Sequence, residues 1–546
     1  MADAVRAPES FDVVIVGAGF GGMYMLHRLR GLGLSAVVFE AASGVGGTWW
    51  WNRYPGARCD VESMQYSYSF DDALQQDWSW SERFAAQPEI LRYAEHVADR
   101  FDLRRDIRFE TRVTQAAFDE ATARWTVRTD RGDAVSAQHV VMATGCLSTT
   151  RTPDFKGLGD FRGATYHTGH WPHGGVDFSG MRVAVIGTGS SAIQAIPVIA
   201  RQAAHVHVFQ RTPNFSIPSR NAPMDEDYEH SWKERYPERR AKARMMRTGI
   251  DYPLNPVSAL EVSEAERWRE YEKRWAAGGT AFVAAFNDII TNAAANETAA
   301  EYVRDQIRAI VKDPRTAALL CPTNHPIATK RICVDTDYFA TFNRPNVTLH
   351  DARTWPVEEI TAQGARTAEG ETAVDAIVFA TGFDAMTGTL LAIDIRGREG
   401  LALREKWTAG PVTYLGLMTA GFPNMFMITG PGSPSVLSNM IVSIEQHVDW
   451  ISGLLGTMAS RGTATVEATP GAEEGWVRHA NEVAHKTLYP QANSWYMGVN
   501  VPGKPQVFMP YIGGVGAYRE LCDDIARKGY EGFLLAPATK AAAAAE

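Results

Sequence analysis

The hydrophobic positions of the chain form the same pattern twice. In the first copy, the apolar run FDVVIV at 11–16 is followed by GAGFGG, by a segment with helical spacing of apolar residues, and by SAVVFE at 35–40. In the second copy, MRVAVI at 181–186 is followed by GTGSSA, by IQAIPVIARQA, and by HVHVFQ at 205–210. A strand, a glycine turn, a helix and a strand make the βαβ unit of a parallel sheet. The pattern therefore predicts an α/β protein with two Rossmann-like dinucleotide-binding domains.

The rest of the chain has a different texture in each region. Two later apolar runs, at 139–145 and 375–384, end in Ala-Thr-Gly turns and are expected to be buried strands that close the two halves. Between 221 and 325 the spacing becomes helical, and residues 221–250 hold thirteen charged side chains, which predicts a helical insertion with a solvated face. The segment 489–514 is rich in Gly, Pro and aromatic residues, which is typical of an ordered loop packed over a site.

The composition excludes several classes of protein. The chain has 546 residues, 45% hydrophobic and 21% charged, with a net charge of −9, which argues against a nucleic-acid-binding surface. The most apolar stretch, 183–200, is interrupted by polar residues and a proline, and the first twelve residues lack the apolar core of a signal peptide. We therefore expect no membrane partner. The five cysteines include no CxxC pair, which favours reduced thiols in a cytoplasmic protein and argues against a disulfide reductase.

The first glycine turn has the spacing of a dinucleotide site. Gly17 permits the turn, Gly19 lets a pyrophosphate approach the backbone, and Gly22 lets the helix and strand pack closely. The helix N-terminus offers unpaired N–H groups to the phosphates. Glu40, twenty-one residues after Gly19, is placed to accept hydrogen bonds from ribose hydroxyls, as for FAD or NAD. The alternative is a structural turn that binds nothing.

The second glycine turn differs in the charge at the end of its second strand. Gly187, Gly189 and Ala192 repeat the spacing, but Arg211 stands where a carboxylate would be expected. An arginine pairs with the 2′-phosphate that a carboxylate would repel, which favours NADPH over NADH. The alternative for Arg211 is an exposed surface charge. The expected contacts of this nucleotide are Gly187, Thr188, Gly189, Ser190, Ser191, Gln194, Arg211 and Thr212.

Two nucleotide sites on one chain allow a hydride to pass from nicotinamide to flavin. The first site is accordingly interpreted as binding FAD and the second as binding NADPH. The expected boundaries are an FAD-binding domain at 1–150 and 385–546, an NADP-binding domain at 151–220 and 326–384, and the helical insertion at 221–325.

A motif beside the second turn selects among flavin enzymes. The segment FRGATYHTGHWPHGG matches FxGxxxHxxxWP through Phe161, Gly163, His167, Trp171 and Pro172. With GGTWWWNRYPGARCD at 46–60 it resembles the single-chain FAD/NADPH Baeyer–Villiger monooxygenases, over nearly the whole chain. Flavin N- and S-oxygenases share the fold and vary this motif, so they are the alternative enzymes. We expect His167 to be a structural or hinge residue rather than a proton shuttle, and Trp171-Pro172 to be a rigid connector.

The resemblance implies a reaction in which a flavin C4a-peroxide attacks a ketone and gives an ester or lactone. It places Arg331 beside the flavin, where a permanent cation stabilises the peroxide and the tetrahedral oxyanion. It places Asp60 next to Arg331 as the anion that orients the guanidinium, and it makes Lys330 a second partner of the NADPH phosphate. The alternatives are a surface salt bridge for Asp60–Arg331 and a solvated Lys330.

The remaining assignments also come from the resemblance. Trp495 is expected on a mobile loop that closes on NADP, with hydrophobic packing as the alternative. The expected flavin-lining residues are Thr48, Trp49, Tyr66, Val113 and Met440, and the expected substrate pocket is Cys146, Leu147, Ser435, Val436 and Leu437. In an apolar pocket Cys146 is expected to be an inert small hydrophobe.

The expected partners are therefore a small ketone and O₂, for a monomer or weak homo-oligomer. From a different class, a non-catalytic flavoprotein that senses redox state would need no Arg331.

Overall fold

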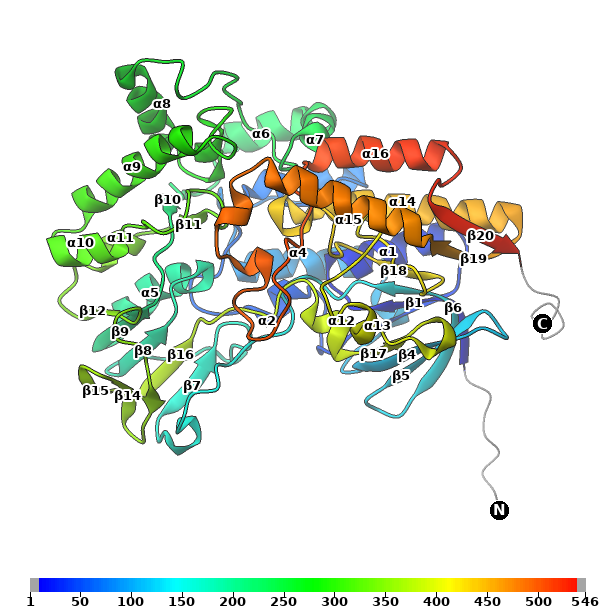
Figure 1. The fold of residues 1–546 in the computed structure, drawn as a ribbon, viewed down its shortest axis with the longest axis horizontal. Helices are drawn as coiled ribbons and strands as arrows, with labels where there is room; N and C mark the ends of the chain where they lie inside the picture. The colour runs from blue at the N-terminus through cyan, green and yellow to red at the C-terminus, as the bar shows by residue number, and fades with distance from the viewer. Residues whose placement is uncertain (1–8, 538–546) are drawn as a thin grey trace.

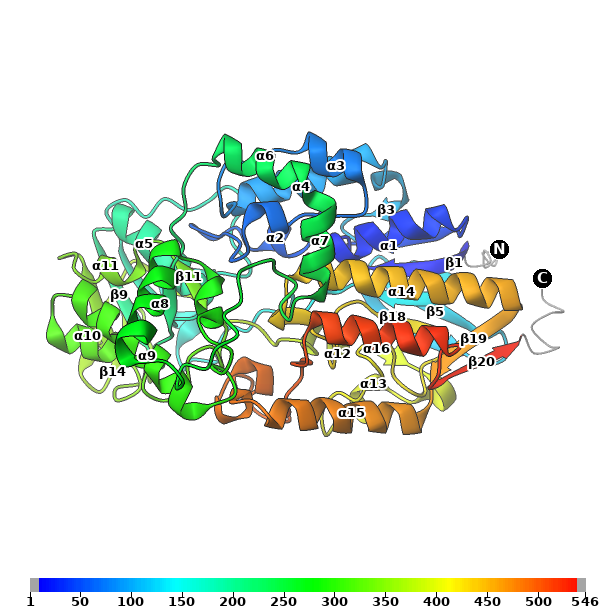
Figure 2. The ribbon, with the colours of Figure 1, turned by 90° about the horizontal axis from the view of Figure 1, so that it is seen from above.

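The structure is a computed structural model that describes residues 9–537; the polar start of the chain at 1–8 and the tail at 538–546 lie outside the described residues. Two lobes lie side by side, each built on its own sheet, and helices cover the outer faces (Figures 1 and 2). Among the described residues, no helix combines the length and the apolar character needed to cross a membrane.

The first lobe is built on an eight-stranded sheet with the order β17-β4-β5-β6-β1-β2-β3, and β18 pairs with the second half of β6. The central strand β1 pairs in parallel with β2 and β6, and its residues Val13, Val14 and Ile15 are fully buried. Helix α1 packs on the sheet beside the long helix α14 (Figure 2). The elements are β1 (Glu9–Val16), α1 (Phe20–Gly31), β2 (Ala36–Phe39), β3 (Ile107–Arg108), β4 (Val113–Asp119), β5 (Arg124–Thr129), β6 (Ala134–Met142), β17 (Asp394–Arg396), β18 (Met425–Met427) and α14 (Met440–Arg461).

The second lobe is built on a five-stranded parallel sheet with the order β12-β9-β8-β16-β7. Helix α5 connects β8 to β9, as the sequence pattern predicts. A small antiparallel sheet, β13-β14-β15, packs on one face of it through a separate apolar cluster. The elements are β7 (Ala164–His167), β8 (Arg182–Ile186), α5 (Ser190–Gln202), β9 (His205–Gln210), β12 (Val347–Asp351), β13 (Glu359–Ile360), β14 (Gly364–Thr367), β15 (Gly370–Ala373) and β16 (Ala376–Phe379).

The helical insertion is divided between the two lobes. Trp232 and Tyr236 join the core of the first lobe, whereas Tyr271 and Tyr302 join that of the second. The expectation of a solvated face is therefore wrong in part. Arg240 is only 5% exposed because its guanidinium donates to groups of the first lobe, among them the carbonyl of Gln65. The helices are α6 (Glu226–Glu234), α7 (Tyr236–Met245), α8 (Glu264–Ala277), α9 (Ala293–Ile310) and α10 (Pro314–Leu320).

The C-terminal part returns to the first lobe and sends one segment between the lobes. This segment, 493–508, contains one short helical turn, Trp495–Met497, with loop around it and lies between the two lobes in both ribbon views; we call it the cover segment. The elements around it are β19 (Thr463–Ala468), α15 (Pro470–His485), α16 (Val515–Arg527) and β20 (Phe533–Pro537). The remaining elements are α2 (Thr48–Trp51), α3 (Asp72–Asp77), α4 (Gln87–Arg100), β10 (Ser216–Pro218), β11 (Cys333–Asp335), α11 (Tyr338–Thr341), α12 (Gly388–Ala392) and α13 (Leu403–Lys406).

Candidate active site

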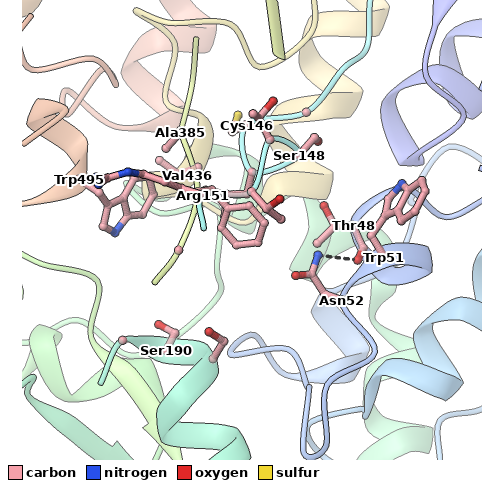
Figure 3. Close-up of a pocket in the computed structure, with 18 of the residues that line it drawn as sticks. Thr48, Trp51, Asn52, Cys146, Ser148, Arg151, Ser190, Ala385, Val436 and Trp495 are labelled. Carbon is pink, nitrogen blue, oxygen red and sulfur yellow. Dashed lines mark hydrogen bonds between the residues drawn. The ribbon is translucent and has the colours of Figure 1, made fainter. Parts of the chain in front are cut away.

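A cavity of about 1690 Å³ lies between the two lobes and reaches both glycine turns. Its wall combines α2, the start of α5, the turn after β6 and the cover segment. Figure 3 shows this convergence: Thr48 and Trp51 stand on one side, Ser190 below, and Cys146, Val436 and Trp495 on the other. Residues far apart in the chain therefore share one space, which is large enough for more than one ligand.

The first glycine turn is tightly constrained by its surroundings. Gly17 has φ +104°, and a Cβ there would lie 2.6 Å from the carbonyl oxygen of Ala143; one on Gly22 would lie 1.8 Å from that of Gly17. Gly17 and Gly19 line the cavity, whereas Gly22 does not, which agrees with its expected packing role. Glu40 is 5% exposed and lines the cavity; its carboxylate accepts from the backbone N–H groups of Ala18 and Ala42 at 2.6 and 2.7 Å.

The second glycine turn has nearly the same geometry. Gly187 has φ +109°, and a Cβ there would lie 2.5 Å from the carbonyl oxygen of Ala380. Ala192 is fully buried where the first turn has Gly22. All eight residues expected to contact the second nucleotide line the cavity: Gly187, Thr188, Gly189, Ser190, Ser191, Gln194, Arg211 and Thr212.

The residues present fit a dinucleotide at each turn. Both helices begin directly after an extended glycine whose side-chain-free backbone leaves the helix N-terminus open, which suits a pyrophosphate. The Glu40 carboxylate keeps acceptor capacity after its two backbone bonds, because two oxygens accept about four hydrogen bonds. On the cover segment, Ser494 Oγ and Asn500 Oδ1 are buried without a hydrogen-bond partner among the described residues. Unpaired buried oxygens are uncommon and indicate a place for a ligand group.

Arg331 and Asp60 form an ion pair in the wall of the cavity. Arg331 Nε donates to Asp60 Oδ2 at 2.8 Å, and Arg331 Nη1 donates to the carbonyl of Val436 at 3.3 Å. The Asp60 side chain is 9% exposed and the Arg331 side chain 35%, and both residues line the cavity. Burial disfavours the charged guanidinium, but the Asp60 carboxylate more than offsets this and raises the pKa of Arg331. A fixed cation therefore faces the cavity.

A second group of positive charges includes Lys330, which directly precedes Arg331 in the chain. Burial, together with the charge of Arg211, lowers the pKa of Lys330, so these two cations lie close together. Arg353 also lines the cavity, and it follows β12, whose last residue pairs with Gln210, the residue before Arg211. Arg211 and Arg353 are exposed. This cluster has the charge that a phosphate group requires.

The expected flavin-lining residues all reach the cavity: Thr48, Trp49, Tyr66, Val113 and Met440. Trp49 Nε1 donates to the hydroxyl of Tyr66 at 3.1 Å, with the two rings edge to face. Asn52 caps the short α2 helix by donating to the carbonyl of Thr48 (Figure 3). These contacts hold an aromatic wall beside the first turn.

The expected substrate residues are divided by the structure. Cys146, Leu147 and Val436 line the cavity, whereas Ser435 and Leu437 do not, although Leu437 packs against the same apolar cluster. The Ser435 hydroxyl lies 3.1 Å from Cys146 Sγ, which also donates to the carbonyl of Thr429 at 3.2 Å. Burial raises the pKa of the Cys146 thiol, so the thiol stays protonated at neutral pH, in agreement with the inert role expected for it.

The motif residues lie outside the cavity: Phe161, Gly163, His167, Trp171 and Pro172. His167 ends β7, and its Nδ1 accepts from the N–H of Gly169 at 3.0 Å, so Nε2 carries the proton and faces the carbonyl of Arg151 at 3.2 Å. A Cβ on Gly163 would lie 2.3 Å from the carbonyl oxygen of Asp375. Both ring nitrogens of His167 are thus paired within the protein, which favours a structural role for this histidine.

Gln194, which was predicted to contact the second nucleotide, also forms hydrogen bonds within the protein. Its Oε1 accepts from the hydroxyl of Tyr54 at 2.8 Å, and its Nε2 donates to the carbonyl of Arg58 at 3.1 Å. Gln194 is on α5 of the second lobe, and its partners belong to the first. The side chain therefore joins the lobes where it also lines the cavity.

Several cavity residues escaped the sequence reasoning, among them Arg151, Arg353, Ser494 and Asn500. A signal existed for Ser494, which directly precedes Trp495. The others follow strands or turns without any spacing that marks them. Trp495, which the resemblance places in contact with NADP, lines the cavity.

Comparisons with known proteins place this arrangement. A family model described as pyridine nucleotide-disulphide oxidoreductase matches residues 14–245. The chain is 42% identical over 536 residues to a Baeyer-Villiger monooxygenase of Pseudooceanicola batsensis, with 96% of each chain covered. It is 42% identical over 529 residues to a phenazine N-monooxygenase of Lysobacter antibioticus, with 96% of this chain and 97% of the relative covered. A solved structure of an oxidized steroid monooxygenase bound to NADP is 53% identical, with a TM-score of 0.93 over 97% of this chain and 100% of that chain.

The two turns and the fold define a flavin-dependent oxidoreductase of the pyridine-nucleotide class. Its cysteines, at 59, 146, 321, 333 and 522, are all free, so it has no reactive disulfide of its own. The chain belongs to the Baeyer–Villiger monooxygenase family. The resemblance seen in the sequence and the α/β fold with two dinucleotide-binding domains are thereby confirmed.

Proposed function

We propose that this chain is a Baeyer–Villiger monooxygenase that uses FAD, NADPH and O₂ to insert one oxygen atom next to a ketone carbonyl, giving an ester or lactone. The observation that carries the proposal is the Arg331–Asp60 pair, which presents a fixed positive charge to the cavity that both glycine turns line. Family membership supports the reaction class.

Residues of both lobes would hold the two cofactors. Gly17, Gly19 and Glu40 would hold the phosphates and ribose of FAD, and Trp49 and Tyr66 would lie against its ring. Arg211 and Lys330 would pair with the 2′-phosphate of NADPH. When bound, FAD accepts a hydride from NADPH and activates O₂.

The proposed role of Arg331 is electrostatic. A negative charge develops on the carbonyl oxygen of the ketone when that carbonyl is attacked, and a donor preorganised beside it lowers the barrier. The guanidinium suits this role because it does not release its proton at working pH. Asp60 accepts a hydrogen bond from Nε of Arg331, and the Val436 carbonyl accepts one from Nη1. The remaining N–H groups of the guanidinium are left to donate to a ligand in the cavity.

The proposed ketone site is the apolar side of the cavity. Cys146, Val436 and Met386 belong to one buried cluster there, together with residues of the cover segment. This wall offers contact area and few polar groups, so it excludes water from the reacting carbonyl. Ser435 and Leu437 would act from behind the wall by shaping it.

The test is conversion of a panel of aryl, cyclic and steroidal ketones by the FAD-loaded protein with NADPH, with product mass and structure determined. We expect a gain of one oxygen as an ester or lactone. The panel should include a sulfide and a phenazine, because one relative is an N-oxygenase. Sulfoxide or N-oxide without ester from any ketone would contradict the proposal and support the alternative.

We also propose the arrangement of the whole chain. All strands of the eight-stranded sheet lie within 1–150 and 385–546, which supports an FAD-binding domain there, and the five-stranded sheet lies within 151–220 and 326–384, which supports an NADP-binding domain. Helices α6–α10 lie within the insertion at 221–325. We propose a cytoplasmic monomer or weak homo-oligomer, which light scattering of the purified protein across a concentration range would test.

A further inference from the structure

The cover segment is attached to one short stretch of the protein, the linker 383–386. This linker follows strand β16 of the second lobe and leads to α12, next to the first lobe's sheet. Lys504 Nζ donates to Asp384 Oδ1 at 2.5 Å and to the carbonyl of Ala385 at 2.6 Å. Asn500 Nδ2 donates to the carbonyl of Phe383 at 2.8 Å. Three hydrogen bonds thus join two segments more than a hundred residues apart in the chain.

The Lys504 contact is unusual for a lysine because it is nearly buried. Its side chain is 9% exposed, and that of Asp384 is 30% exposed. Ion pairs at a fully solvated surface contribute little, because water screens them and both side chains lose freedom. A lysine that is almost removed from water and bonds both a carboxylate and a carbonyl is costly to leave unpaired. The contact therefore has the character of a structural anchor.

The linker that receives Lys504 is itself part of the cavity. Phe383 and Ala385 line it, and the N–H of Met386 donates to the carbonyl of Cys146 at 2.8 Å. Asp384 N–H donates to the carbonyl of Thr149, beyond the turn that ends β6. The position of Asp384 consequently depends on both lobes. The position of Lys504, and with it the cover segment, depends on Asp384 in turn.

The cover segment carries the groups that need a ligand. Ser494 is 2% exposed and Asn500 is part-buried; both line the cavity, and each has a side-chain oxygen without a hydrogen-bond partner among the described residues. The Ser494 hydroxyl precedes a helical turn but does not cap it, so it is free for another partner. The side-chain amide orientation of Asn500 is fixed by its bond to the Phe383 carbonyl, which leaves Oδ1 as an acceptor.

We propose that Lys504 is a positioning residue that holds the cover segment over the nicotinamide half of NADP(H) by bonding to Asp384 and Ala385. The location follows from the neighbours of the segment. Tyr496 lies near Arg331, and Trp495 packs against Tyr496, whereas Arg211 and Lys330 mark the phosphate end. This inference rests on the proposed function only for the identity of the cofactor.

The experiment uses the FAD-loaded full chain with Lys504→Met, Asp384→Asn and the double variant. The matched control is Lys486→Met, an exposed lysine on the turn after α15. Calorimetric titration measures the Kd of NADP⁺ and of the adenosine bisphosphate fragment of NADP. We expect Lys504→Met to weaken NADP⁺ binding about 10-fold or more, to leave the fragment unchanged, and to make the cover segment faster to cleave by protease in saturating NADP⁺. The double variant should add little to Lys504→Met, because both remove one contact.

Two results would overturn the inference: unchanged NADP⁺ affinity in Lys504→Met with a folded, yellow protein, or an equal loss of affinity for the adenosine fragment. If Lys504→Met lowers the thermal midpoint, Asp384→Asn provides the second reading, since it keeps the lysine buried and weakens only the pair. These binding readouts require no ketone. A parent protein that binds NADP⁺ but oxygenates no ketone would contradict the proposed function alone.

Discussion

The two glycine turns of this protein have the same backbone and opposite surroundings. Gly17 and Gly187 have φ values of +104° and +109°, and each lies against the carbonyl of the alanine in an Ala-Thr-Gly turn. The two sites differ at the end of the strand that follows each turn and helix. Glu40 is buried and bonded to backbone N–H groups, whereas Arg211 is exposed beside Lys330.

This difference suits the first turn to a cofactor that stays bound and the second turn to a cofactor that exchanges with solvent. A Cβ on Gly19 would lie 3.4 Å from Gly47, so the first turn is enclosed by the protein, whereas one on Gly189 would meet nothing within 4 Å. An enclosed site with a buried acceptor favours a group that stays, as FAD does. An open site with exposed cations favours a phosphate that arrives and leaves, because charge attracts it and solvent access releases it.

The largest expected effect comes from the charge of Arg331, which lines the cavity that both turns share. Arg331→Ala should reduce ketone oxygenation about 100- to 1,000-fold, because a preorganised donor to a developing oxyanion is removed. FAD content and the Kd of NADP⁺ should change little, since neither turn is altered. Turnover with a ketone, flavin absorbance and NADP⁺ titration measure the three quantities. Normal turnover in this variant would contradict the oxyanion role, and loss of both cofactors would show that the turns depend on Arg331.

The matched pair Gly17→Ala and Gly187→Ala tests the comparison directly. Each places a Cβ within 2.6 Å of a backbone carbonyl at positive φ, which costs about 3 kcal/mol, or roughly 100-fold in affinity. Gly17→Ala should be purified with little flavin, whereas Gly187→Ala should stay yellow and lose NADPH affinity. The ratio of flavin to protein absorbance and an NADP⁺ titration decide this. Equal flavin loss in both variants would mean that the turns are not specialised.

Arg211→Gln should weaken the preference for NADPH over NADH by roughly 10- to 100-fold, because a charged hydrogen-bonded pair with the 2′-phosphate is lost. The kcat/KM values for the two cofactors give the ratio. NADH kinetics should be nearly unchanged, which serves as the internal control. An unaltered ratio would make Arg211 a solvated surface charge and leave Lys330 and Arg353 as the phosphate ligands.

The smallest effect concerns acid stability in the two sheets. Burial lowers the pKa of His139 on β6 to about 3, and burial with neighbouring histidines lowers that of His207 on β9 to about 4. Both are neutral in the folded protein, so the unfolded chain binds protons first, and stability is lost as pH falls below about 6.5. His139→Leu should flatten the loss of thermal midpoint between pH 6 and 4 more than His207→Leu does. The exposed His230 supplies the control substitution, and equal slopes in all three variants would contradict the argument.

The local features of this protein were predictable, because they are written in neighbouring residues. Alternating and helical periodicity, two glycine turns and the Ala-Thr-Gly returns determine backbone conformation within a few residues of themselves. The structure accordingly has β1, α1, β2 and β8, α5, β9 where the pattern predicts them. The preference for a phosphate near Arg211 could also be predicted, since an arginine carries its positive charge in any solvated position.

Contacts between distant parts of the chain were decided only by the tertiary structure. Arg331 and Asp60 are 271 positions apart, and Lys504 and Asp384 are 120 apart. No periodicity links such pairs, because their meeting depends on how the two lobes and the cover segment pack. For the same reason the sequence did not show that the helical insertion packs against both cores. It also did not show that Ser435 lies behind the residues that line the cavity. Local sterics act through the chain, whereas burial and ion pairing act through space.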